Sequence, residues 1–249
     1  MRRGSTRPAG RTDGGGPRVF PIPKPRGGTR WLTELDQAGD ADLRRAVRPL
    51  AGRIERSLGP EVLAIRAVRR GEDWALAPWV PARAAWRRRV HRAIRTATPS
   101  TTFAVADILD CYASILPETI GALLGPEAAH AVALLRRFHE QGVRGLPVGP
   151  EPSAILANAV LARLDDAIRT HGISHVRWVD DVVLWGPSDD LRAAMSALDT
   201  AAAEMGLQVH PRKTRILEDR DEAADVLPGD RDSSIIAAPC GPSTAHRAS

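Results

Sequence analysis

Two adjacent carboxylates, Asp180 and Asp181, lie between two short apolar runs, residues 176–179 and 182–185. The β-branched and aromatic residues of these runs favour a pleated, half-buried surface, so the pattern predicts a β-hairpin with the two acids at its tip. Neighbouring carboxylates repel each other unless a divalent cation binds against them, and oxygen ligands of this kind suit Mg²⁺. Aspartate is also a common turn residue, so the pair taken alone is more typical of a solvated turn.

A third carboxylate, Asp107, follows the apolar run 103–106, which is typical of a buried strand. A carboxylate in that position is costly unless it is paired or metal-bound, although aspartate is also common between a strand and a helix. The predicted order of strand, helices, hairpin, helix and strand indicates an α+β fold with a ferredoxin-like palm, an antiparallel sheet with helices on one face. In that fold the end of the first strand lies beside the hairpin tip. Three convergent carboxylates can hold two Mg²⁺ ions that activate a hydroxyl and stabilise a leaving pyrophosphate.

The elements that position these acids can be read from hydrophobic spacing. Apolar residues recur at helical intervals in four segments, around residues 43–58, 131–138, 155–164 and 191–198. Ser114 and Ser153 precede two predicted helices, and we expect each serine to cap its helix. Residues 207–209 and 214–217 are predicted to be short strands.

Composition restricts the class of protein. The chain is 43% hydrophobic and 26% charged, as expected of a globular protein, and we find neither a membrane-spanning apolar run nor a secretory leader. Its two cysteines make neither a disulfide framework nor a zinc site, so we expect a cytoplasmic protein without membrane association. A net charge of +5 and a pI of about 10.1 favour polyanionic partners.

The basic residues are unevenly distributed by type. Of the 35 lysines and arginines, only Lys24 and Lys213 are lysines, which is either chance or a requirement for a compact ammonium group. Lys24 and Arg30 lie in a basic segment with a Gly-Gly turn, where they are candidates for a phosphate site, although a surface hairpin is the simpler interpretation. Tryptophans alternate with arginines in residues 69–89, which is typical either of nucleic-acid contact or of a core with a solvated basic face.

These patterns divide the chain into four parts. We expect a disordered basic arm over residues 1–20 and a mostly helical part over 21–102, which the family resemblance described below identifies as fingers-like. The palm, with its catalytic carboxylates, is predicted over 103–217. A mostly disordered tail is predicted over 218–249.

The motifs, taken in order over about residues 22–217, resemble those of the reverse transcriptases. The segment 107–115, DILDCYASI, resembles the first palm motif of that family. Residues 145–158 resemble the second motif, and Trp178-Val179-Asp180-Asp181 resembles the third. Gly206-Leu207 followed by Lys213-Thr214 resembles the fourth.

The resemblance implies a fingers and palm architecture and roles for particular residues. Asp107, Asp180 and Asp181 would bind two Mg²⁺ ions, with Mn²⁺ as an alternative. Tyr112 would lie under the sugar of the incoming nucleotide and disfavour a 2′-hydroxyl. The substrate-binding residues implied by the family are Lys24, Arg30, Tyr112, Gly149, Ser153 and Lys213. The implied partners are deoxynucleoside triphosphates and an RNA template, DNA, or both.

Two departures from the family pattern refine the prediction. Val148 stands where glutamine is usual and Trp178 stands where tyrosine or phenylalanine is usual, and the second motif is most similar to those of bacterial abortive-infection, phage-defence reverse transcriptases. No thumb or primer grip is recognisable after Leu217. We therefore expect either that a protein partner or an oligomer supplies that function, or that synthesis is short, protein-primed or untemplated. The alternative function is a catalytically decayed palm that binds RNA or DNA. A nucleotide cyclase is disfavoured by Tyr112 and by the 145–158 motif.

Overall fold

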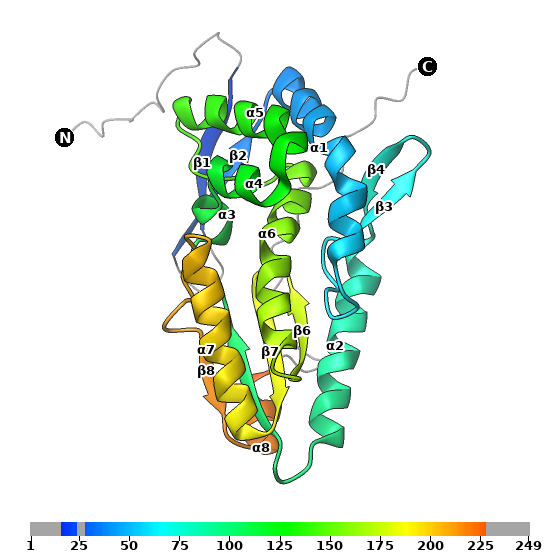
Figure 1. The fold of residues 1–249 in the computed structure, drawn as a ribbon, viewed down its shortest axis with the longest axis vertical. Coiled ribbons are helices and arrows are strands. Elements are labelled where there is room, and N and C mark those ends of the chain that lie inside the picture. Colours follow the sequence, from blue (N-terminus) through cyan, green and yellow to red (C-terminus); the bar gives the residue numbers. More distant parts are fainter. Residues whose placement is uncertain (1–15, 24–27, 228–249) are drawn as a thin grey trace, which may run out of the picture.

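The structure, a computed structural model, describes residues 16–23 and 28–227 (Figure 1). The strands are β1 (Arg18–Pro23), β2 (Thr29–Glu34), β3 (Ala67–Arg70), β4 (Asp73–Leu76), β5 (Thr102–Ala106), β6 (Ser174–Trp178), β7 (Asp181–Gly186) and β8 (Arg215–Leu217). The helices are α1 (Gln37–Ser57), α2 (Trp79–Thr96), α3 (Cys111–Ser114), α4 (Pro117–Leu124), α5 (Ala129–Glu140), α6 (Glu151–Arg169), α7 (Ser188–Glu204) and α8 (Arg220–Val226), with a short 3₁₀ helix η1 (Gly125–Ala128). None of the described helices is long and apolar enough to cross a bilayer.

A four-stranded antiparallel sheet forms the palm, with the strand order β6-β7-β5-β8. The hairpin β6–β7 confirms the prediction for residues 176–185, and β5 is the predicted buried strand. Because α7 connects β7 to β8, which pairs with the other edge of β5, the palm has the predicted split arrangement of strands.

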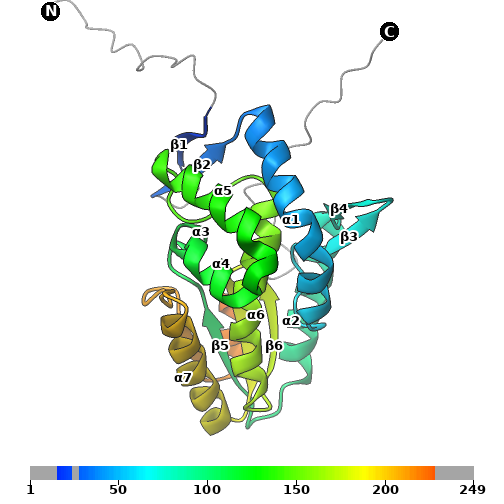
Figure 2. The same cartoon turned by 45° about the horizontal axis from the view of Figure 1, so that its top comes forward.

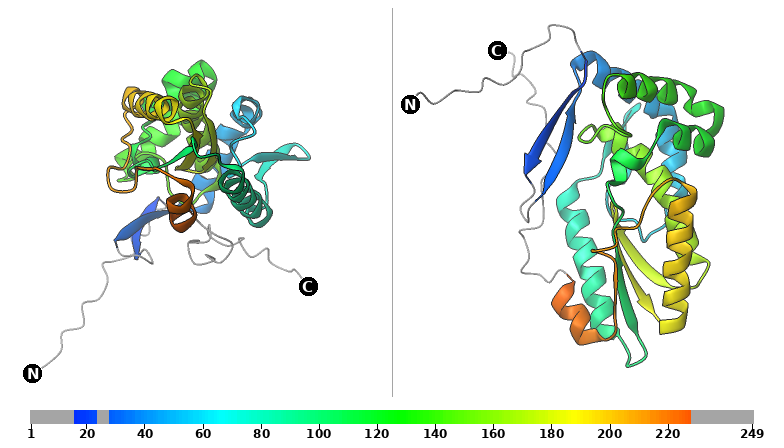
Figure 3. Two further views of the ribbon diagram at one scale, coloured as in Figure 1. Left: turned by 90° about the horizontal axis from the view of Figure 1, so that it is seen from below. Right: turned by 90° about the vertical axis from the view of Figure 1, so that its left-hand side faces the viewer.

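The two faces of this sheet bury alternate residues of each strand. One face packs against α6 and α7, as predicted for the palm helices, through Ala104, Ala106, Val182, Leu184 and Ile216. The opposite face packs against α2 and α8 through Phe103, Val105, Val176, Val183 and Leu217. The right-hand view of Figure 3 shows the sheet lying between α2 and α8 on one side and α7 on the other.

The tryptophans of residues 69–89 divide between the core and the surface. Trp86 is only 3% exposed and packs edge-on against Trp178, with ring centroids 6.4 Å apart. The Arg83 guanidinium lies 4.3 Å above the Trp86 ring and 4.9 Å from that of Trp178. Trp86 and Trp178 therefore attach α2 to the palm, whereas Trp79 is exposed.

The long helix α6 lies at the centre of the molecule. Its residues are buried on almost every side, because α7, α1 and α4 all pack against it (Figure 2). The loop that precedes α6 therefore leads into a rigid element, and the second motif is made of this loop and the first turns of α6.

Several local predictions were wrong. Ser114 and Ser153 are not caps: Leu116 and Pro150 occupy the N-cap positions of α4 and α6, and Ser153 lies inside α6. The fingers part contains the expected β1–β2 hairpin but also a second hairpin, β3–β4, within a segment predicted to be mostly helical.

The terminal boundaries also differ from the prediction. β1 begins at Arg18, inside the predicted arm, since Arg18 pairs with Glu34. In the predicted tail, Asp219 caps α8, whose Ala223 is buried against the palm. Residues 1–15 and 228–249 lie outside the described part of the chain.

Candidate active site

The strand register places Asp107 directly beside the hairpin that carries the acidic pair. Ala106 pairs with Val182, so the next position on each strand sets Asp107 opposite Asp181. Trp178 pairs with Asp181, which makes Val179 and Asp180 the two turn residues. The predicted tip, Asp180 with Asp181, was therefore displaced by one residue, and the turn is formed by a β-branched valine with φ at +57°.

The three carboxylates are close enough to perturb one another. Burial raises the pKa of Asp180 to about 6, and the charge of Asp107 adds to this shift. Desolvation also raises the pKa of Asp181, followed by the charges of Asp180 and Asp107 and by a hydrogen bond with the Asp107 carboxyl. The site thus concentrates negative charge that a cation would stabilise.

Lys213 supplies part of the compensating charge. Its Nζ donates a hydrogen bond to Oδ2 of Asp107 at 2.8 Å. The same turn holds the Asp107 backbone, because the His210 N–H donates to the Asp107 carbonyl at 2.7 Å and the Asp107 N–H donates to Oγ1 of Thr214 at 3.4 Å. The fourth motif therefore positions the carboxylate of the first.

The three carboxylates fit a divalent ion by the chemistry of their donor atoms. Among the described residues, no group of three or more acidic, histidine or cysteine side chains forms a cage that could hold a metal ion. Mg²⁺ does not require such a cage, since it binds one or two carboxylates and completes its shell with water and substrate phosphates. Asp107, Asp180 and Asp181 are the residues that would hold it.

Tyr112 and the second motif meet through the backbone. The Leu146 N–H donates to the Tyr112 carbonyl at 2.8 Å, and Gly145 lies so close to this turn that an added Cβ would contact the carbonyl oxygens of Tyr112 and Ala113. Gly145 has φ at +63°, a conformation that glycine adopts without strain. Glycine at position 145 therefore allows the loop to approach α3.

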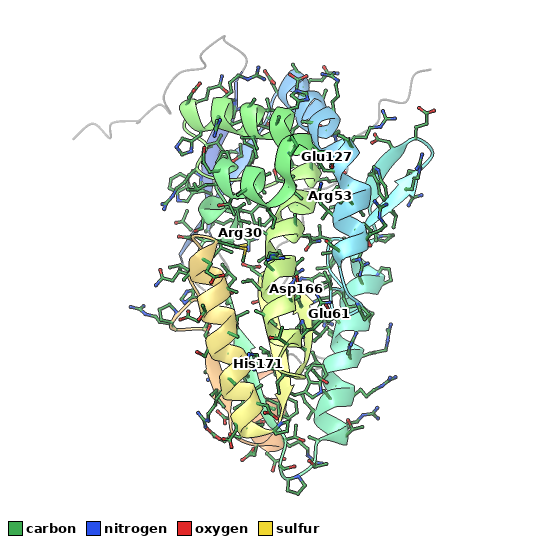
Figure 4. The ribbon with its side chains drawn as sticks, viewed as in Figure 1. Arg30, Arg53, Glu61, Glu127, Asp166 and His171 are labelled. Atoms are coloured by element: carbon green, nitrogen blue, oxygen red, sulfur yellow. The ribbon has the colours of Figure 1, made fainter. Side chains whose placement is uncertain are left out.

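Arg30 reaches the same region from β2. The Thr33 N–H donates to the Val148 carbonyl at 2.8 Å, and Gly149 packs against the Thr33 carbonyl, so β2 is joined to the second motif. The positive charge of Arg30 lowers the pKa of Asp180, which places it within electrostatic reach of the acids. Figure 4 shows Arg30 at the level of α3.

For two of the predicted substrate-binding residues, the described structure shows no place beside the three carboxylates. Lys24 lies outside the described residues. Ser153 is completely buried, and its hydroxyl has no hydrogen-bond partner among the described residues, so it presents no surface to a substrate in this conformation.

The sequence interpretation missed two residues that support the hairpin. Arg177 is completely buried on β6, and its guanidinium forms a bidentate contact with Asp165 of α6, which is 1% exposed. The available signal was an arginine within an otherwise apolar strand. Its partner could not be inferred from spacing, because a helix and a strand meet there.

Comparisons with known proteins decide the family. Residues 22–224 match the model of the family described as reverse transcriptase (RNA-dependent DNA polymerase), which is well over half of the chain. The chain belongs to the reverse transcriptase family. This finding confirms the family resemblance and the fingers and palm fold class, and it accounts for the order of the motifs around the three carboxylates.

A solved structure provides a second comparison for this reverse transcriptase. Apo telomerase from Candida tropicalis, truncated from its C-terminal domain, is similar over 82% of this chain with 13% identity and a TM-score of 0.48. The match covers 49% of the telomerase chain, so the present chain spans about half its length. No curated protein matches the sequence.

The close approach at Gly145 predicts an effect on stability. Gly145→Ala adds a strained φ, worth about 1 kcal/mol, and a clash with the α3 carbonyls, worth roughly a further 1–3 kcal/mol. Denaturant unfolding measures the loss. Gly172→Ala is the control, because Gly172 has φ at +65° and an added Cβ there meets no atom within 4 Å. Equal losses in the two variants would contradict the close approach.

Proposed function

We propose that this chain is an RNA-directed DNA polymerase that transfers a deoxynucleotidyl group from a deoxynucleoside triphosphate to a 3′-hydroxyl. The observation that carries the proposal is the convergence of Asp107 with Asp180 and Asp181 through one strand register, in a chain of the reverse transcriptase family. Lys213 and Arg30 add positive charge at the same place.

The proposed step is a substitution at the α-phosphorus. The 3′-oxygen forms a new P–O bond as the bond to the β-phosphate oxygen breaks, pyrophosphate leaves, and the hydroxyl proton passes to solvent. Two Mg²⁺ ions, or Mn²⁺ in their place, would lower the pKa of the hydroxyl and neutralise the charge on the phosphates when bound.

Particular residues of the chain would bind the metal ions, the triphosphate and the sugar. The three aspartates would hold the metal ions, while Lys24 and Arg30 would neutralise the triphosphate and Lys213 would assist the leaving pyrophosphate. Tyr112 would lie against the sugar and disfavour a 2′-hydroxyl. The 145–150 loop, fixed to the backbone of Tyr112 and Thr33, would pack near the templating base pair.

The basic surface of α2 supports a nucleic-acid partner. Helix α2 contains no acidic residue, and its exposed Arg88 and Arg92 are one helical turn apart, where like charges repel. Together with Trp185 they line an open pocket of roughly 510 Å³. Phosphates would relieve the repulsion, and the indole offers a surface on which a base can stack.

Finer features of the proposal rest on the sequence resemblance. We place the chain with the bacterial abortive-infection type, acting in the cytoplasm in antiviral defence, on the form of the 145–158 motif. We also propose that a partner protein or a second copy helps to hold the duplex. In support, the described segment after β8 packs into the palm through Ala223 of α8 and through Leu227, which follows that helix.

The first prediction concerns Asp180. With Mg²⁺ or Mn²⁺ and labelled deoxynucleotides, the wild type will extend a primer on an RNA template. The rate of incorporation by Asp180→Asn should be lower by a factor of about 100 or more, because the variant lacks one of the metal-binding carboxylates. Asp199→Asn, an exposed acid on α7, is the control and should retain full activity. Primed DNA and template-free reactions show whether synthesis is templated.

The opposite result would favour the alternative function. If neither protein incorporates nucleotide on any substrate while both bind RNA equally, the chain is either a binding module with a decayed palm or an enzyme that awaits its partner.

The second prediction concerns the α2 surface. Arg88→Gln combined with Arg92→Gln should reduce the slope of log affinity against log salt concentration for single-stranded RNA by about 1–2, because each lost phosphate contact removes about 0.7. Fluorescence anisotropy at several salt concentrations measures the slope. The control is Arg136→Gln with Arg137→Gln on α5, where both arginines are paired with acids. An unchanged slope for the α2 variant would show that nucleic acid binds elsewhere.

A further inference from the structure

Arg177 is completely buried on the face of β6 that meets α6. Its Nε donates to both carboxylate oxygens of Asp165 at 2.9 and 3.0 Å, and its Nη2 donates to Oδ2 at 2.8 Å. His175 Nε2 lies 3.4 Å from the same carboxylate. Burial alone would raise the pKa of Asp165, but Arg177 and His175 hold it below its ordinary value.

The remaining guanidinium nitrogen connects this ion pair to the hairpin turn. Nη1 donates to Oδ1 of Asn158 at 3.0 Å and to the carbonyl of Val179 at 2.8 Å. Asn158 in turn donates through Nδ2 to the Ile65 carbonyl at 2.9 Å. One buried cluster thus joins α6, the hairpin turn and the segment before β3.

Both carbonyls that the cluster binds belong to strained residues. Among the described residues, only three non-glycine residues have a positive φ, and two of them are Ile65 at +58° and Val179 at +57°. A β-branched residue in this conformation is held there by its surroundings at a cost of roughly 1–3 kcal/mol. Buried ion pairs contribute little net stability to a fold. The main effect of the Arg177–Asp165 pair is therefore on the conformation of the turn.

We propose that Arg177 is a positioning residue that, fixed by Asp165 and Asn158, holds the Val179 carbonyl and thereby sets Asp180 and Asp181 beside Asp107. The effect of this arrangement on catalysis rests on the proposed polymerase function. The arrangement of the turn itself does not, and it can be measured without any activity.

Arg177→Lys tests the proposal. Lysine keeps the charge beside Asp165, but a single ammonium cannot replace the planar fork that binds Asp165, Asn158 and Val179 together. The amides of residues 178–182 should exchange hydrogen about tenfold faster, the change expected from losing one charge-assisted hydrogen bond. The kcat for nucleotide incorporation should fall roughly 10- to 100-fold, as for other residues that orient metal ligands, with the KM for the nucleotide little changed.

Arg53→Lys is the matched control. Arg53 also binds a carboxylate and a carbonyl, those of Glu127 and Leu124, but at the surface of α1 away from the hairpin (Figure 4). Its substitution should leave hairpin exchange and kcat unchanged. Thermal unfolding of both variants reports on the fold, and if Arg177→Lys does not fold, Asn158→Ala replaces it with the same expected direction.

Failure of the positioning proposal and failure of the polymerase function give different results. Unchanged exchange at residues 178–182 in the folded variant would overturn the proposal, and so would faster exchange without a fall in kcat. If the wild type incorporates no nucleotide, the polymerase function fails, while the exchange measurement still decides whether Arg177 sets the turn.

Discussion

The antiparallel pairing of β5 with β7 is the constraint on which the rest of the site depends. With Ala106 opposite Val182, Asp107 stands beside Asp181, and the alternate residues of both strands face α6 and α7 on one side and α2 and α8 on the other. A shift of one residue would exchange the two faces and separate the carboxylates. The apolar residues that fill the two cores therefore also determine the geometry of the acids.

The balance of charge at the three carboxylates links the separate sequence motifs. The charge of Asp107 raises the pKa of both Asp180 and Asp181, and the Lys213 turn and Arg30 offset part of the repulsion from two sides. Each cation is held by backbone contacts to the palm or to the second motif rather than by the acids alone. A bound divalent ion would complete this balance of charge.

Much of this arrangement could be predicted from the sequence, and the errors have physical causes. The hairpin, the buried strand before Asp107 and the four main helices follow from hydrophobic spacing. The tip was displaced by one residue because its turn is made by Val179, which has no intrinsic preference for a positive φ and is held by Arg177. The β3–β4 hairpin was missed because its strands are only four residues long. Arg177 and Asp165 meet only through tertiary packing.

The most direct test is to locate a bound divalent ion. Carboxylate sites accept several divalent metals, so Fe²⁺ can replace Mg²⁺ and, with ascorbate and peroxide, cleave the backbone next to its site. The account predicts cleavage near Asp107 and near Asp180 in the wild type, suppressed by excess Mg²⁺ and absent in Asp180→Asn. Cleavage elsewhere, or cleavage that Asp180→Asn does not change, would contradict a metal site formed by these carboxylates.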